Sequence, residues 1–189
     1  MDNRLKIINY LGKNLGMPFT MREVSKATRI PYATFHRTIG VMTQTIEIQP
    51  VGKSKTITLN VNNPVIGSYL AVSSNEEKNN YLKKYPLIAK LASELDQKQT
   101  VLLFGSYAKG NERRDSDIDL MVINRKGDKT FSLSKYELLF RKKINIIFLS
   151  NTEFIKMLKD KAENVGKQAL KGHIILTNPE GFWRCVLNG

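Results

Sequence analysis

The feature that most constrains this chain is a glycine–serine pair followed, after a spacer of ten residues, by two aspartates two positions apart. Gly105-Ser106 ends an apolar run over residues 100–104, and Asp117 and Asp119 begin a second run that continues to residue 123. Side chains two apart on a strand point to the same face, so both carboxylates should project together. Glycine lets the backbone approach a ligand closely, and exposed amides with the Ser106 hydroxyl can hold phosphate oxygens.

Two carboxylates on one strand face repel each other unless a cation neutralises them. Carboxylate oxygens favour Mg²⁺, which completes its shell with triphosphate oxygens. The residues between and after the aspartates, Ile118, Leu120 and Val122, should fill the opposite face of the strand, which argues against a solvated surface loop. The phosphate-binding turn at Gly105-Ser106 and the carboxylate pair together predict a site for a metal-bound nucleotide.

This segment resembles the signature of the DNA polymerase β nucleotidyltransferase superfamily, in which Gly-Ser, a spacer of ten residues and Asp-x-Asp follow one another. The resemblance extends from about residue 80 to the end, where residues 171–176 and 179–182 are similar to the closing strand of minimal transferases. It implies transfer of a nucleoside monophosphate, expected to be AMP from ATP, to an acceptor hydroxyl with the help of two Mg²⁺ ions. The residues that it assigns are the catalytic metal ligands Asp117 and Asp119 and the nucleotide contacts Gly105, Ser106, Lys109 and Arg113.

The chain departs from the family pattern at the third carboxylate, which a later strand normally supplies. In the run over residues 142–148, Asn145 stands at the expected position and is taken as the third metal ligand. Asparagine offers an oxygen but no charge and is a poor base, so transfer should suffer more than nucleotide binding. The spacing selects no substitute among four other acidic residues, which are Glu112, Asp115, Asp128 and Glu137. A nucleotidyltransferase is the first hypothesis; a nucleotide-binding transcriptional regulator or antitoxin-like protein without transfer activity is the alternative.

The first third of the chain predicts three helices followed by a hairpin. Helical spacing of apolar residues covers about residues 4–15, 21–28 and 32–42, and Thr20 with Glu23 forms a capping box before the second helix. The period then changes to two on either side of a basic, turn-rich loop at residues 49–55. This order resembles the winged helix-turn-helix domains of prokaryotic regulators over about residues 3–61.

In such domains the third helix enters the major groove and the wing contacts the DNA backbone. Residues 1–62 hold nine Lys and Arg against three Asp and Glu, whereas residues 63–189 hold 21 against 14, so the first third is the more basic part. Basic segments attract the phosphates of duplex DNA. A module that only binds protein is the alternative. The expected DNA contacts are Tyr32, Thr34, His36 and Arg37 on the helix and Lys53 and Lys55 in the wing.

The expected fold class is therefore α+β, with a winged helix followed by a small mixed sheet flanked by helices. We expect a winged-helix domain at residues 1–62, an Asn- and Ser-rich linker at 63–79 and a nucleotidyltransferase domain at 80–189. Within the last domain the pattern predicts helices over 76–97, 152–161 and 165–170, with Pro86 starting or kinking the first, and strands over 100–104, 117–123, 144–149 and 173–176.

The sequence also indicates the setting. No apolar run approaches the ~20 residues needed to cross a bilayer, the first residues lack the apolar core of a signal peptide, and one cysteine, Cys185, allows no internal disulfide. A cytoplasmic protein without a membrane partner is expected. The expected partners are a nucleoside triphosphate, duplex DNA and a protein acceptor, and a homodimer is left open.

Overall fold

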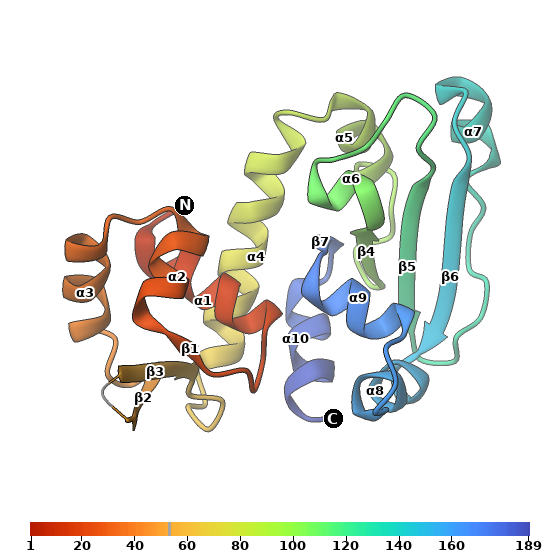
Figure 1. The fold of residues 1–189 in the computed structure, drawn as a ribbon. Coiled ribbons are helices and arrows are strands. Elements are labelled where there is room, and N and C mark those ends of the chain that lie inside the picture. Colours follow the sequence, from red (N-terminus) through yellow and green to blue (C-terminus); the bar gives the residue numbers. More distant parts are fainter. Residues whose placement is uncertain (53) are drawn as a thin grey trace. The chain divides into compact units, whose positions relative to one another are not determined.

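The computed structural model describes residues 1–52 and 54–189, and the chain divides into two compact units, Met1–Ser73 and Ser74–Gly189 (Figure 1). The boundary falls inside the segment 63–79, which the sequence predicts as a linker. Most of that segment is helical, however, because it belongs to α4 (Ile66–Leu82). Ile66, Leu70, Ser73 and Ser74 are buried at helical spacing, and the two serines hide this period from an apolar pattern.

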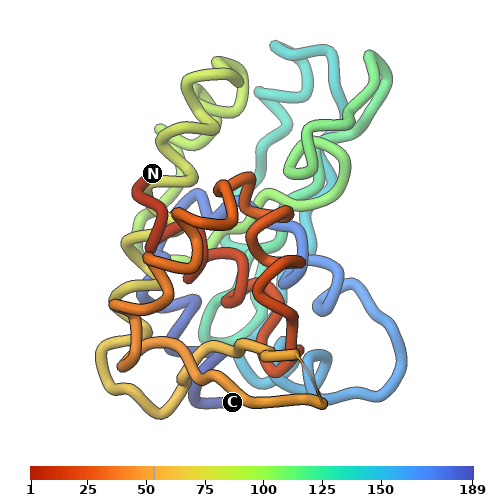
Figure 2. Tube along the Cα trace, turned by 60° about the vertical axis from the view of Figure 1, so that its left-hand side comes forward, coloured from red at the N-terminus to blue at the C-terminus, as the bar shows by residue number. Residues whose placement is uncertain are grey.

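The first unit begins with the three helices and the hairpin that the sequence predicts, in that order; the short strand β1 before the second helix was not predicted. Its elements are α1 (Asn3–Lys13), β1 (Phe19–Thr20), α2 (Met21–Thr28), α3 (Tyr32–Gly40), β2 (Ile46–Val51) and β3 (Ser54–Leu59). The strands form an antiparallel sheet in the order β1-β3-β2, which lies along one side of the helices (Figures 1 and 2). The paired strands extend further into the predicted loop 49–55 than the turn residues suggest.

Local signals in the sequence account for these boundaries. The capping box before α2 is present, since the Thr20 hydroxyl accepts from the Glu23 amide and the Glu23 carboxylate accepts from the Thr20 amide. Phe35 and Ile39 of α3 are buried, as predicted, and so is Met42, although the helix ends at Gly40 and not at the predicted residue 42. Helix α1 ends earlier than predicted, because the Asn14 side chain donates to the Tyr10 carbonyl at 2.8 Å and closes the last turn.

The second unit is a four-stranded mixed sheet with helices. Strand order is β6-β5-β4-β7; β5 and β6 are parallel, and the other two pairs are antiparallel. The elements after α4 are α5 (Pro86–Ala92), β4 (Thr100–Phe104), α6 (Gly105–Lys109), β5 (Ile118–Asn124), α7 (Ser134–Phe140), β6 (Ile144–Ser150), α8 (Asn151–Lys159), α9 (Val165–Lys171), β7 (Ile174–Thr177) and α10 (Pro179–Leu187). The helix predicted over 76–97 is two helices, because Pro86 begins α5.

Alternation along the strands gives the sheet two apolar faces. Ile118, Leu120 and Val122 are fully buried in one core cluster with α5 and α7, as predicted for the residues around the aspartates. Helices α8, α9 and α10 lie over the other face and bury Phe154 and Trp183. Residues 117, 119 and 145 alternate along their strands with members of the first core cluster. Their side chains therefore point away from that core and are available to form a site at the end of the sheet. No helix in the described part of the chain is long and apolar enough to cross a membrane.

Candidate nucleotide and metal site

Three neighbouring strands bring the predicted site residues to one end of the second sheet. Strand β4 runs antiparallel to β5 and pairs Phe104 with Asp119, so Gly105 follows directly beside this aspartate. Strand β6 runs parallel to β5 and pairs Asn145 with Asp119. The sequence predicts a strand over 117–123 that includes Asp117. In the structure Asp117 instead lies just before the first residue of β5.

The Asn145 side chain lies between the two aspartates. Its Nδ2 donates to Asp117 Oδ2 at 3.3 Å and to Asp119 Oδ1 at 3.0 Å. Because both carboxylates reach the same amide, they share one face, as the spacing predicts. The position of Asn145 is that expected for a third ligand, and its role as a metal ligand stays a prediction.

Among the described residues one ion pair reaches this carboxylate pair, and the ammonium group of Lys142 binds the Ser116 carbonyl just before Asp117. The nearest cation is Lys143, whose Nζ lies 3.9 Å from Asp117 Oδ2, and the Lys143 side chain is 69% exposed. Such an exposed ion pair contributes little, because water screens it. The amide of Asn145 satisfies hydrogen bonds but neutralises no charge. A bound cation would therefore relieve the repulsion between the two carboxylates.

Among the described residues no third carboxylate, imidazole or thiol joins the pair, since no group of three His, Cys, Asp or Glu gathers there. Glu137 is used elsewhere, because its Oε1 accepts from the Ile144 amide at 2.9 Å. The Glu112 carboxylate lies 3.4 Å from the Tyr85 hydroxyl, which donates to it. Asp115 is exposed on the loop before β5, and Asp128 follows the opposite end of that strand. These four residues therefore do not restore the missing carboxylate.

Gly105 is required for two independent reasons. Its φ is +71°, in the left-handed region that favours glycine. A Cβ at this position would overlap Asp119 Oδ2 and lie 3.2 Å from Asp119 Cγ. The backbone of the glycine–serine turn is thus in van der Waals contact with a carboxylate of the pair, and the two halves of the motif form a single site.

We expect Gly105→Ala to lower Mg-ATP affinity by at least about tenfold, or about 1.4 kcal/mol, because the added Cβ would overlap Asp119 Oδ2 and displace this carboxylate. Gly16→Ala is the matched control, because Gly16 has φ +73° but no atom within 4 Å of an added Cβ. It should cost similar stability and leave nucleotide binding unchanged. Calorimetric titration of both variants makes the comparison; equal affinities would contradict the assignment of Gly105 to the site.

The loop between Gly105 and Asp117 is held by aromatic residues that sequence reasoning missed. The Tyr81 hydroxyl donates to the Tyr107 carbonyl in α6 at 2.9 Å, and Tyr85 stacks on Tyr81 with ring centroids 4.3 Å apart. Burial raises the pKa of Tyr81 above its usual range, because the charged phenolate would lose its hydration. The spacing of four residues between Tyr81 and Tyr85 in a helical segment was the available signal.

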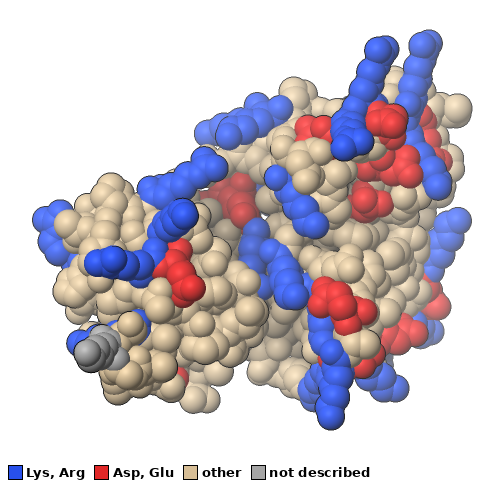
Figure 3. Space-filling model, viewed as in Figure 1, with Lys and Arg blue, Asp and Glu red and all other residues tan. Residues whose placement is uncertain are grey.

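The basic residues expected at the nucleotide are both exposed. Lys109 ends α6, and its side chain packs beside Gly172, where a Cβ would lie 3.3 Å from Lys109 Cε. Arg113 lies in the loop, where its amide donates to the Ser116 hydroxyl at 2.8 Å. Ser106 is half-buried in the first turn of α6. Acidic side chains gather beside α6 and the adjoining ends of β5 and β6 (Figure 3).

The residues expected to contact DNA lie in the first unit. Tyr32, His36 and Arg37 are exposed on α3, whereas Thr34 is half-buried. Lys55 is exposed on β3, and Lys53 lies outside the described residues. Arg22 of α2 lies beside these residues, with its guanidinium carbon 5.8 Å from the centre of the Tyr32 ring.

The mixed sheet with its helices, and the glycine–carboxylate site at its end, fit a nucleotidyltransferase domain. Residues 87–180 match the family model described as Polymerase beta, Nucleotidyltransferase. The match includes Gly105, Ser106, both aspartates and Asn145, and it supports this superfamily for the second unit and a nucleotidyl transfer activity in general. No curated protein and no solved structure matches the chain.

Proposed function

We propose that this protein is a Mg²⁺-dependent nucleotidyltransferase that transfers AMP from ATP to an acceptor hydroxyl and is tethered to a DNA-binding winged helix. The observation that carries the proposal is the contact between the Gly105 backbone and the Asp119 carboxylate. Because of this contact, phosphate oxygens held at the glycine–serine turn would lie beside the carboxylate pair. This is the arrangement that a metal-bound triphosphate requires.

The residues at the site suit magnesium. Asp117 and Asp119 supply oxygen ligands, and they face each other around a neutral amide. Bound there, magnesium would neutralise the triphosphate and assist both the attacking and the leaving oxygen. Asn145 would then have to turn its amide so that Oδ1 replaces Nδ2 beside the carboxylates, because only the oxygen can bind a cation.

The chain's other residues would orient the reactants. The turn at Gly105 and the Ser106 hydroxyl would hold phosphate oxygens, while Lys109 and Arg113 would offset their charge. In the transfer the acceptor oxygen bonds to the α-phosphorus as the bond to pyrophosphate breaks, and the acceptor proton must leave. Asn145 is a poor base for that proton, so this step is the weak one. A protein hydroxyl is the acceptor class we favour, because the Asp117 side chain is 39% exposed and so leaves room for a large acceptor.

The second candidate is a nucleotide-binding regulator that does not transfer. It is favoured by Asn145, which leaves two negative charges where relatives of this type have three. In that case the site would still bind Mg-ATP through Asp117 and Asp119, and nucleotide binding would control the first unit's interaction with DNA.

The proposal for the first unit depends on its element order and charge. Three helices and a hairpin support a winged helix, in which α3 would enter the major groove. Its excess of six positive charges over residues 1–62 supports duplex DNA as the partner rather than a protein alone. We place the protein in the cytoplasm, in line with its single cysteine.

Calorimetric titration of the full chain with ATP, with and without Mg²⁺, tests the shared part of both candidates. We expect binding with Mg²⁺ and a loss of binding when a chelator removes the metal, because the two carboxylates would repel the bare triphosphate. Binding that does not depend on Mg²⁺, or no binding in either condition, would contradict the assignment of the site.

A further inference from the structure

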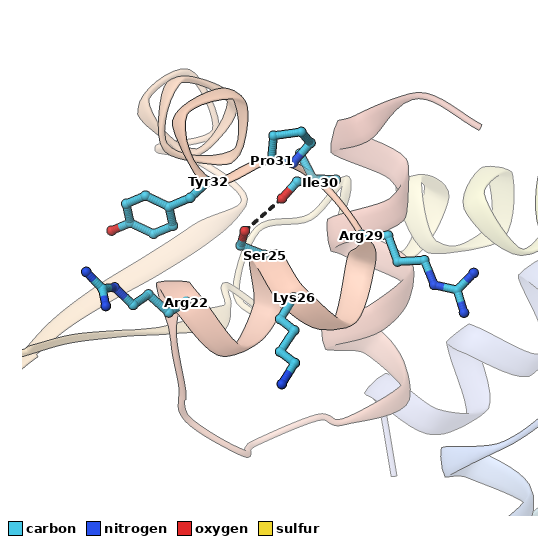
Figure 4. Close-up of a pocket in the computed structure, with 7 residues that line it drawn as sticks. All are labelled: Arg22, Ser25, Lys26, Arg29, Ile30, Pro31 and Tyr32. Atoms are coloured by element: carbon cyan, nitrogen blue, oxygen red, sulfur yellow. Dashed lines mark hydrogen bonds between the residues drawn. The ribbon is translucent and has the colours of Figure 1, made fainter.

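A stripe of cations runs along α2 of the first unit, outside the residues expected to contact DNA. Arg22, Lys26 and Arg29 are spaced by four and three residues, so they share one side of the helix and its C-terminal cap. With Tyr32 they line a shallow hollow of about 470 Å³ (Figure 4). The figure shows the three cations spread along the hollow, with Arg22 beside Tyr32 at one end and Arg29 at the other.

A second hollow of about 550 Å³ continues this surface toward the hairpin. It is lined by Thr20, Met21, Arg22, Tyr32, His36, Ser54 and Lys55. Since both hollows share Arg22 and Tyr32, they join across this pair. We call the joined surface the basic track, and its polar residues are Arg29, Lys26, Arg22, Tyr32, His36 and Lys55.

Positive charge outweighs negative charge along the basic track, where Glu23 is the neighbouring carboxylate on α2. Neither hollow is lined by an Asp or Glu, and no ion pair involves Arg22, Lys26 or Arg29 in the part of the chain that the structure describes. The neighbouring Glu23 is held in the capping box, where its carboxylate accepts from the Thr20 amide at 2.7 Å. Cations gathered in this way attract an anionic partner that spans them.

The backbone at the end of α2 is held in a defined conformation that positions this stripe. Arg29 caps α2 with φ 55°, a left-handed conformation that is uncommon for a residue with a side chain. The following turn is fixed because the buried Ser25 hydroxyl donates to the Ile30 carbonyl at 2.7 Å (Figure 4). This bond holds the Arg29–Tyr32 turn against α2 and so fixes where the stripe meets α3.

We propose that the basic track binds the phosphate backbone of duplex DNA, with Arg22, Lys26 and Arg29 as contacts additional to those of α3 and the hairpin. This inference rests on the proposed DNA binding by the first unit. The shape favours a polymer over a free nucleotide, because seven residues of helix span about 10 Å and the track continues beyond Arg22 to Lys55. One DNA strand carries a phosphate every ~3.4 Å along the axis, so the α2 stripe alone would cover about three.

The test is duplex binding by the full chain, measured by fluorescence anisotropy between about 50 and 200 mM salt. The variant replaces Arg22, Lys26 and Arg29 with Ala. The matched control replaces Lys98, Lys159 and Lys161, three exposed cations of the second unit, and loses the same charge. Since each neutralised phosphate contributes about 0.9 to the slope of log K against log salt, we expect the variant's slope to fall by about 2–3 and its affinity to fall at least about 100-fold. The control should keep the wild-type slope.

The outcomes separate this inference from the proposed function. If the wild type binds duplex and Arg37→Ala weakens it, while the α2 variant behaves like the control, the inference fails and DNA binding stands. If the wild type binds no duplex, both fail. If the variant loses binding to single-stranded DNA but keeps binding to duplex DNA, the assignment of the track to duplex DNA is overturned. The track would then bind single strands, whose bases can stack on Tyr32. Equal melting temperatures of variant and wild type show that the fold is intact, as expected for exposed residues.

Discussion

Asp119→Asn is expected to lower Mg²⁺-dependent nucleotide transfer by about 10³-fold, since metal stabilisation of the reacting charges is worth several kcal/mol and each ~1.4 kcal/mol is tenfold in rate. The substitution keeps the size of the side chain but removes the charge beside Gly105 and Asn145. Asp119 is also half-buried between β4 and β6, so no other carboxylate can move into its place. Rates of pyrophosphate release with and without Mg²⁺ measure the effect.

Asp115→Asn is the control for this variant, because it makes the same chemical change on the exposed loop before the pair. It should keep wild-type activity. The melting temperature of Asp119→Asn should equal or exceed that of the wild type in a metal-free buffer, since one of two neighbouring carboxylates loses its charge. A loss of activity accompanied by lower stability would instead indicate a structural role for Asp119.

Asn145→Asp is expected to raise transfer, or to create it, by about 10²–10⁴-fold, the range of general-base assistance. The new carboxylate would replace an amide whose nitrogen lies 3.0 Å from Asp119 and 3.3 Å from Asp117. It would supply the third charge that a second Mg²⁺ needs and a base for the acceptor proton. Affinity for Mg-ATP should change only modestly, because Asp117 and Asp119 already supply its ligands.

The same variant gives a readout that does not depend on finding the acceptor. Without metal, three adjacent carboxylates should lower the melting temperature below that of the wild type, and Mg²⁺ should restore it by more than it raises the wild type. Asn124→Asp is the control, since Asn124 ends β5 away from the site and its Nδ2 also donates, to the Asp128 carbonyl at 2.9 Å. It should lose stability without gaining a response to Mg²⁺. A melting temperature of Asn145→Asp that does not respond to Mg²⁺ would contradict the metal site.

The core of the site could be predicted because its signals are local. Two carboxylates at strand spacing, a glycine–serine turn and the apolar residues between them lie within 20 residues of sequence, and the structure brings them together. The place of Asn145 beside the pair was expected from the family resemblance, in which a later strand supplies a third carboxylate at this position. Contacts over longer distances were not predictable in this way, and the bond between Tyr81 and Tyr107 is the clearest case.

The elements that the sequence did not predict also have physical reasons. Helix α7 lacks an amphipathic pattern, because Leu138 and Leu139 are 82% and 68% exposed. In α4 buried serines stand where apolar residues would mark a helix, so the sequence predicts a linker over its first half. The basic track depends on β3 lying beside α2, which no spacing within either element reveals.

The central claim is that the carboxylate pair carries Mg²⁺-dependent nucleotidyl transfer, and the most direct measurement is incubation of the full chain in host extract with radiolabelled ATP and Mg²⁺. Label on the α-phosphate should pass to an acceptor, label on the γ-phosphate should leave with pyrophosphate, and both should cease in Asp119→Asn. Relative to the extract alone, added transfer of the γ-label, or added α-labelling that persists in Asp119→Asn or after removal of Mg²⁺, would contradict the claim.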